Sequence, residues 1–175
     1  MTGSKESFTS NFSSPSFGLE LRTVGKESME NLPVPTRRSE RWKYSPISRV
    51  VNSSLHTCTV EGVVWPQEIL PNPIPFLESY RIVFRNGIYV SSLSDLPIAE
   101  GVVCSPLSTI ESPEFVNTYH KKEWVGAVNA AFHQDGLFFS LEKGVVLDRP
   151  LIVHNLFDGE DVATFPRHYI NLGEG

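Results

Sequence analysis

Cysteine is scarce in this sequence of 175 residues, and the scarcity excludes several classes of protein. The two cysteines, Cys58 and Cys104, lie far apart and form no C-x-x-C pair. Neither a disulfide framework nor an all-cysteine metal site is therefore expected. Long apolar runs are missing too, so we expect no membrane span. The first residues contain no apolar stretch of the kind that a signal peptide needs. A reducing, cytoplasmic location fits these absences best.

Positive charge is also limited. Lys and Arg number 15 against 20 Asp and Glu, which gives a net charge of −5. The longest basic runs are the pairs at 37–38 and 121–122. This balance argues against a face that binds nucleic acid. A hydrophobic content of 40% supports a core of ordinary size for a single domain.

The clearest positive signal is β patterning near the end of the chain. Leu137, Phe139 and Leu141 alternate with their neighbours at a period of two residues, which is typical of a strand. Further short runs are separated by Gly144 and by the Asp-Arg-Pro at 148–150. The pattern predicts four strands, near 137–141, 145–147, 151–153 and 168–172. Lys143-Gly144 fits either an antiparallel turn or a corner between two strands of a coil.

Elements of other kinds precede these strands. The run from Tyr80 to Val90 predicts a β-hairpin, because Asn86-Gly87 is a strong two-residue turn signal. A short strand is expected at 101–104. Helical spacing predicts one helix from Phe17 and another that begins near Ser112-Pro113 and continues through 132. These patterns divide the chain into a disordered lead (1–16), a helical and mixed region with the hairpin (17–135), and a strand region (136–175).

A basic and aromatic segment lies at 36–48. Arg41, Trp42, Lys43 and Tyr44 form its centre, directly after the extended Leu-Pro-Val-Pro at 32–35. One interpretation is a docking motif in which the two rings are buried against the body of the protein and the charges stay in water. The alternative is a phosphate or nucleotide site built from the arginines at 37, 38 and 41. No Gly-rich phosphate loop accompanies these arginines, which favours docking.

Other polar groupings have the composition of catalytic or metal sites without the spacing of known motifs. A loop near the end could hold a metal through imidazole and carboxylate ligands, or could be a solvated turn. Two His–acid pairs could act in proton transfer, but no G-x-S-x-G motif accompanies them. We interpret all of these as ordinary polar residues. They are His154, Asp158, Glu160, Asp161 and His168 in the loop, and His120 with Glu123 and His133 with Asp135 in the pairs.

The order of motifs resembles one family. Glu-Arg-Trp-Lys-Tyr at 40–44 follows Leu-Pro-x-Pro, and the Arg-Asn-Gly-x-Tyr-Val hairpin comes next. Asn-Ala-Ala-Phe at 129–132, followed by Asp135-Gly136, is a second and independent match. Leu-Asp-Arg-Pro-Leu and Pro-Arg-His-Tyr-Ile-Asn-Leu-Gly-Glu-Gly complete the series. From about Leu32 to Gly175 the chain resembles the N-terminal part of the SufD branch of the SufB/SufD family of iron–sulfur cluster assembly proteins.

The resemblance implies an α+β, mainly β fold. A short N-terminal helical region and the β-hairpin would lead into the first rungs of a right-handed parallel β-helix, with Lys143-Gly144 as a corner. It implies a non-enzymatic scaffold that associates with a SufB-like subunit and a SufC-like ATPase. The cluster would be handled by the full complex, and no cofactor, metal ligand or catalytic residue is carried over to this segment.

Two other functions are compatible with the residues. A carbohydrate-active β-helix enzyme would use paired carboxylates such as Glu142 and Asp148. A generic binding module would add a strand of a partner to its open sheet edge, near Ile170.

Overall fold

The computed structural model describes residues 5, 8–45, 47–58, 74–110 and 122–174. The expected helix start at Ser112 and most of the expected strand or loop at 54–64 lie outside these residues. The described helices are α2 (Leu19–Asn31), α3 (Ile47–Val51) and α4 (Trp124–Phe132), with 3-10 turns η1 (Glu40–Trp42), η3 (Ser91–Leu93) and η4 (Leu107–Thr109). The described strands are β1 (His56–Thr57), β2 (Tyr80–Arg85), β3 (Ile88–Tyr89), β4 (Val102–Pro106), β5 (Leu137–Leu141), β6 (Leu151–Leu156), β7 (Val162–Ala163) and β8 (Tyr169–Leu172).

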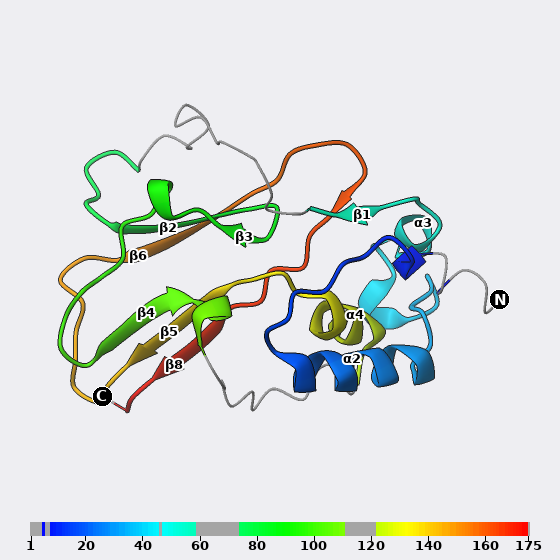
Figure 1. Ribbon diagram of the computed structural model, residues 1–175, viewed down its shortest axis with the longest axis horizontal. Helices are drawn as coiled ribbons and strands as arrows, with labels where there is room; N and C mark the ends of the chain where they lie inside the picture. Colours follow the sequence, from blue (N-terminus) through cyan, green and yellow to red (C-terminus); the bar gives the residue numbers. More distant parts are fainter. Residues whose placement is uncertain (1–4, 6–7, 46, 59–73, 111–121, 175) are drawn as a thin grey trace.

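Helices gather at one end of the molecule and the larger sheets at the other (Figure 1). The three-stranded sheets have the orders β3-β2-β6 and β4-β5-β8, and β1 pairs with β7. In each larger sheet an early central strand has an antiparallel neighbour on one side and a later, parallel strand on the other. The architecture is α+β with several small sheets, as the coarse prediction stated.

The hairpin prediction is confirmed. β2 and β3 are antiparallel neighbours, with Phe84 opposite Tyr89 and Arg85 opposite Ile88. The turn residues Asn86 and Gly87 have φ values of 48° and 80°. Asn and Gly tolerate this left-handed region with little strain, which explains why the sequence signal was reliable.

An apolar core fills the space between the two larger sheets. It is built around Ile82 and Phe84 of β2 and Leu137 and Phe139 of β5. These residues alternate along their strands, so one face of each sheet turns inward. The core therefore joins strands from both sides of residue 136. On its other face β2 is covered by η3, where Val83 packs with Leu93.

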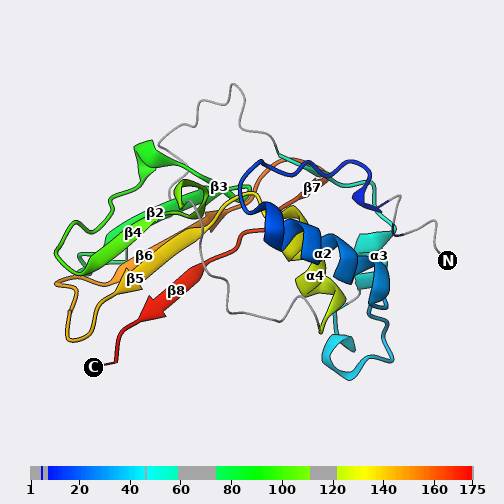
Figure 2. The same ribbon diagram turned by 60° about the horizontal axis from the view of Figure 1, so that its bottom comes forward.

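A second core belongs to the helices. α2 buries Leu21, Gly25 and Met29, which recur every four residues, against α4 (Figure 2). A Cβ on Gly25 would lie 2.6 Å from the backbone nitrogen of Ala131, so only glycine allows this approach of the two helices. The predicted helix near Phe17 is confirmed and begins at Leu19.

Part of the predicted disordered lead is packed against this helical core. Phe8 is only 4% exposed, and its ring lies edge-on to Phe12 at a centroid distance of 4.9 Å. Phe12 also contacts Phe132 of α4 and Phe165. The serine-rich composition suggested disorder, but two phenylalanines at helical spacing supply the apolar area that holds this segment in place.

The strands after residue 136 differ in one detail from the prediction. Strands are present at 137–141, 151–156 and 169–172, but 145–147 is not a strand. β5 and β6 belong to different sheets, so Lys143-Gly144 is not the turn of an antiparallel hairpin. Gly144 has a φ of 75° and lies in a corner that leads from one sheet to the other.

In three parallel pairs, a strand from late in the chain lies beside an earlier strand of the same sheet. β6 lies beside β2, β7 beside β1 and β8 beside β5. Side chains match across the last pair: Phe138 and Tyr169 stack with their rings 5.4 Å apart and nearly parallel. Ile170 and Leu172 pair in register with the core residues Phe139 and Leu141, yet are 60% and 62% exposed. Ile170 and Leu172 are therefore apolar residues that no other described residue covers, although their register partners belong to the core.

Candidate docking site

The segment between α2 and α3 begins where α2 ends. Leu32 is extended, with φ −86° and ψ 144°, and its N–H closes the helix on the Ser28 carbonyl at 2.9 Å. Pro33 and Pro35 cannot donate backbone hydrogen bonds, so the helix cannot continue. The extended elbow expected at 32–35 is confirmed.

A compact turn follows the elbow. The backbone N–H of Thr36 donates to the Ser39 hydroxyl at 3.2 Å, and the N–H of Ser39 donates to the Thr36 carbonyl at 2.9 Å. The N–H of Trp42 then donates to the Ser39 carbonyl at 2.9 Å and closes η1. These bonds hold Arg41 and Trp42 on consecutive positions of one short turn.

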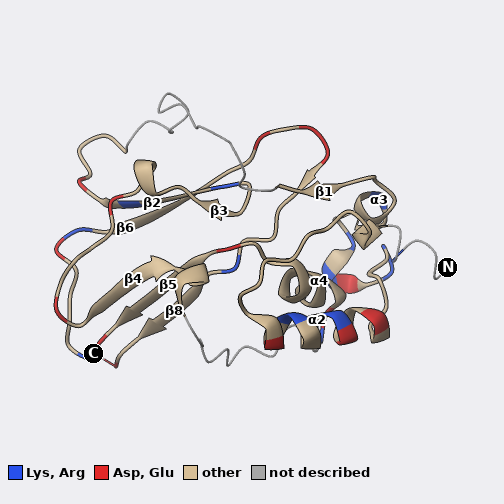
Figure 3. Ribbon diagram, in the orientation of Figure 1, with Lys and Arg blue, Asp and Glu red and all other residues tan. Residues whose placement is uncertain are grey.

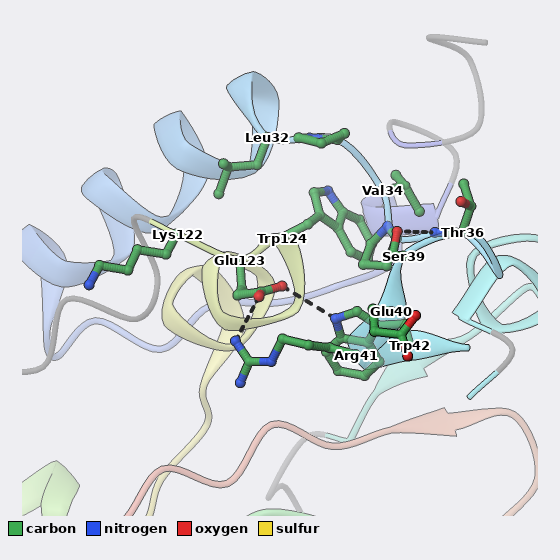
Figure 4. Close-up of a pocket in the computed structure, with 12 residues that line it drawn as sticks. Leu32, Val34, Thr36, Ser39, Glu40, Arg41, Trp42, Lys122, Glu123 and Trp124 are labelled. Atoms are coloured by element: carbon green, nitrogen blue, oxygen red, sulfur yellow. Dashed lines mark hydrogen bonds and ion pairs between the residues drawn. The ribbon is translucent and has the colours of Figure 1, made fainter. Parts of the chain in front are cut away.

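Both side chains reach Glu123, the residue that precedes α4 (Figure 4). Arg41 Nη1 lies 2.8 Å from Glu123 Oε1, and Trp42 Nε1 donates to Oε2 at 3.3 Å. The Arg41 side chain is 68% exposed, so the ion pair by itself contributes at most about 1 kcal/mol. Its main effect is to orient Arg41 and the indole of Trp42 against the start of α4.

The two rings of the predicted docking motif behave differently. Trp42 is half-buried, whereas Tyr44 is 89% exposed, so the expectation that both rings are buried is wrong for Tyr44. The turn places Trp42 against Glu123 and leaves Tyr44 in solvent, where the Lys43 ammonium lies 5.4 Å from its ring centre. Arg41 and Trp42 contact the body of the protein, and Lys43 and Tyr44 are presented outward.

A hollow of about 370 Å³ lies between this segment and the start of α4. Trp124, which is buried, forms part of its wall, and its indole Nε1 has no hydrogen-bond partner within the described part of the chain. Figure 4 shows Leu32 and Val34 on one side of Trp124, with Arg41 and Trp42 on the other. The lining residues are Leu32, Pro33, Val34, Pro35, Thr36, Ser39, Glu40, Arg41, Trp42, Lys122, Glu123 and Trp124.

The candidate metal loop does not form a metal site in the described residues. Asp158 forms an ion pair with Arg85 and accepts a hydrogen bond from Asn86 at 3.0 Å. His168 Nδ1 accepts from the Leu137 N–H at 3.0 Å, and burial lowers the pKa of His168. No group of three His, Cys, Asp or Glu side chains in the described ranges could hold a metal ion. These polar residues attach the loop to β2 and β5.

The described members of the candidate acid–base pairs have other hydrogen-bond partners. Glu123 is engaged by Arg41 and Trp42, and its expected partner His120 lies outside the described residues. His133 Nδ1 contacts the Ala130 carbonyl at 3.0 Å. Asp135 instead accepts from the backbone N–H and the hydroxyl of Ser108, both at 3.0 Å.

The carboxylates proposed for a carbohydrate-active enzyme face solvent. Glu142 and Asp148 are both exposed. The Tyr80 hydroxyl donates to Asp148 at 2.8 Å and lowers the pKa of that carboxyl, with a smaller effect from Arg149. A glycosidase needs one acid with a raised pKa beside a second carboxylate, so this pair does not support that activity.

A buried polar junction between α2 and the end of α4 was not expected. Arg22 is 2% exposed and donates to the backbone carbonyls of Phe17, Ala131 and His133. Burial lowers the pKa of Arg22 to about 10. Burial, and then the nearby Arg22 charge, lowers the pKa of His133 to about 3. An arginine and a histidine in these contexts look like surface residues, so no local signal could have identified the junction.

None of the described helices is long and apolar enough to cross a lipid bilayer.

An α+β chain with this order of elements and this basic–aromatic segment can be assigned to a family. The SufBD protein N-terminal region family matches residues 8–153, so the chain belongs to it. One similar protein is the iron–sulfur cluster assembly protein SufD of Escherichia coli (strain K12), which is 27% identical over 146 residues. That match covers 81% of this chain and 33% of the relative, so the chain spans about a third of the relative's length. The resemblance to the N-terminal region of SufD is thereby confirmed.

Proposed function

We propose that this chain is the N-terminal portion of a SufD-like accessory subunit of a cytoplasmic iron–sulfur cluster assembly complex. Its role is that of a non-enzymatic scaffold that associates with a SufB-like subunit and a SufC-like ATPase. The single observation that carries the proposal is the family match over residues 8–153, together with the likeness to a protein named for cluster assembly. The cluster is cargo of the complex, and we assign no ligand for it in this segment.

The architecture proposed for this role is the beginning of a right-handed parallel β-helix. The strands β6, β7 and β8 follow one another in the chain and lie beside β2, β1 and β5, as successive turns of a coil would. The connection from β5 to the parallel β8 passes through the other sheets, and such crossovers are right-handed in nearly all proteins. A further turn on the open edge would cover Ile170 and Leu172.

Co-purification tests the proposed role. The tagged chain, co-expressed with the SufB-like and SufC-like proteins of the same organism, is expected to elute with them as one species in size-exclusion chromatography. Deletion of the codons for residues 1–175 in that organism is expected to lower the amount of assembled complex and the activity of iron–sulfur enzymes. A complex of unchanged amount and composition after this deletion would overturn the scaffold role.

The edge of β8 has no neighbouring strand among the described residues, which also favours a second candidate, a module that binds a strand from another chain. Strand addition would cover the apolar Ile170 and Leu172 by a dimer contact. Light scattering distinguishes the candidates, because a dimer that dissociates in an Ile170→Asn variant favours strand addition between copies.

A further inference from the structure

The hollow beside Trp124 combines apolar walls with a size suited to a few side chains. Its volume of about 370 Å³ lies at the small end of the range of ligand pockets, roughly 300–1,000 Å³. Leu32 and Val34 are packed against the helical core behind them, and Trp42 is held by Glu123. The wall at 32–35 contains two prolines, whose fixed φ restricts its movement. A ligand would therefore meet a surface that is already ordered, which reduces the entropic cost of binding.

The segment at 36–43, which we call the rim, forms one wall of the hollow and carries more basic than acidic residues, with Arg37, Arg38, Arg41 and Lys43 against Glu40. Arg37 and Arg38 lie between Thr36 and Ser39, which both line the hollow, and Lys43 follows Trp42. All three cationic side chains belong to exposed residues, and none is within ion-pair distance of a carboxylate of the described residues. Figure 3 shows this concentration of Lys and Arg on the segment between α2 and α3. The local charge is opposite to the net charge of −5 of the whole chain.

The chemistry of the hollow favours a peptide over a phosphate group. Glu123 already places a carboxylate at the start of α4, and this charge opposes a phosphate at the helix N-terminus. Pro33 and Pro35 have no backbone N–H to offer, so the wall cannot cradle phosphate oxygens. The exposed ring of Tyr44 and the neighbouring arginines are instead the residue types that dominate protein–protein contacts.

We infer that the hollow and its rim bind an acidic peptide segment of a partner protein. A large apolar side chain of the peptide occupies the hollow against Trp42, and flanking Asp or Glu side chains pair with Arg37, Arg38 and Lys43. The inference goes beyond the proposed function and does not rest on it, since it concerns only the charges and walls of this site.

Random-peptide phage display on the immobilised chain of 175 residues tests this inference. Enriched peptides are expected to carry Asp or Glu beside a large apolar residue, and a synthetic copy of one is expected to bind more weakly as salt is raised. The Arg37→Glu/Arg38→Glu variant should lose at least about tenfold in affinity, because like charges then face the peptide. Lys143→Glu, a single reversal of charge at an exposed site in the corner between β5 and β6, should bind as the parent does.

Melting temperatures of the variants show whether they fold, and both substitution sites are exposed, so folded variants are expected. The inference is overturned if no peptide is enriched, if the enriched peptides have no acidic preference, or if folded Arg37→Glu/Arg38→Glu binds them unchanged. Competition by inorganic phosphate at concentrations below those of the salt effect would reassign the site to a phosphate ligand and also overturn it. These outcomes leave co-purification with the assembly proteins unaffected, so the two proposals fail separately.

Discussion

His133 is the most completely enclosed titratable side chain of the helical body. It is fully buried, its Nε2 has no partner in the described part of the chain, and its Nδ1 lies at the Ala130 carbonyl. The neighbouring Arg22 guanidinium is also buried. Protonation of the ring would place a second positive charge beside the first, away from water, so the neutral ring is required for this packing.

Stability is therefore expected to depend on His133 as pH falls. The folded-state pKa is about 3 and the ordinary value is 6.5, so the unfolded chain binds more protons between these values. The free energy of unfolding should rise with pH across this window and decrease as pH drops from about 6.5 towards 3, by up to about 4–5 kcal/mol. Denaturant melts at several pH values measure this slope.

Matched variants isolate the contribution of this histidine from the general effect of acid on carboxylates. His133→Leu should flatten the slope between pH 6.5 and 4, whereas substitution of the exposed His56 by Gln should leave it unchanged. Equal slopes for His133→Leu and the parent chain would show that His133 is not the group responsible.

Three aromatic residues around the hollow give a graded prediction. Trp124 is buried, Trp42 half-buried and Tyr44 exposed. Replacement by Ala should lower the free energy of unfolding by about 3–5 kcal/mol for Trp124, about 1–2 for Trp42 and less than about 0.5 for Tyr44. Urea melts would contradict this account of the segment if Tyr44→Ala were as costly as Trp124→Ala.

At the scale of elements, the close contact of α2 and α4 depends on Gly25. A Cβ at this position would lie 2.9 Å from the Ala130 side chain and closer still to the Ala131 backbone. Gly25→Ala should therefore lower the free energy of unfolding by about 1–3 kcal/mol, although Ala is the better helix former by about 1 kcal/mol.

Thr23→Ala is the control for this helix, because Thr23 is exposed on α2 and the substitution also raises helix propensity. Its melting temperature should change little or rise. If Gly25→Ala were stabilising, the two helices would have room that the structure does not show.

The elements that could be predicted from the sequence are those specified by local rules. Asn86-Gly87 defines the hairpin through backbone conformation alone, and the alternation at 137–141 defines β5 through burial of one face. The strand at 145–147 was predicted from the same alternation but is absent, because these residues form the corner between sheets. β7 was missed because two residues beside a polar loop carry no periodicity.

The sequence predicts which residues make up the candidate site, but only some of the contacts that they form. The segment 41–44 stood out because rings and cations alternate in it. The role of Glu123 could not be predicted, since it lies 82 residues from Arg41 in the sequence. The contact of Arg22 with His133 spans 111 residues and depends on how α2 packs, which no local pattern specifies. The domain boundaries at 16 and 135 stay predictions.

On the scale of the whole molecule, the strands β5 and β8 differ in how far their side chains are buried. Phe139 and Ile170 are register partners on neighbouring strands, but only Phe139 is buried. Phe139→Ala should lower the free energy of unfolding by about 3–5 kcal/mol, whereas Ile170→Ser should change it by less than about 1 kcal/mol in this chain.

The same pair of variants should differ in solution behaviour. Ile170→Ser removes exposed apolar surface from a sheet edge, so it should reduce concentration-dependent association, which light scattering measures. A large loss of stability in Ile170→Ser would mean that the edge strand is already covered, contrary to its exposure of 60%.

In both larger sheets the antiparallel edge strand comes earlier in the chain than the parallel edge strand. β3 and β4 are the antiparallel edges, and β6 and β8 are the parallel ones. A ribosome therefore delivers the antiparallel pair of each sheet before the strand that joins it in parallel. The pair can form as soon as it has been synthesised, and the later strand then finds its template already in place.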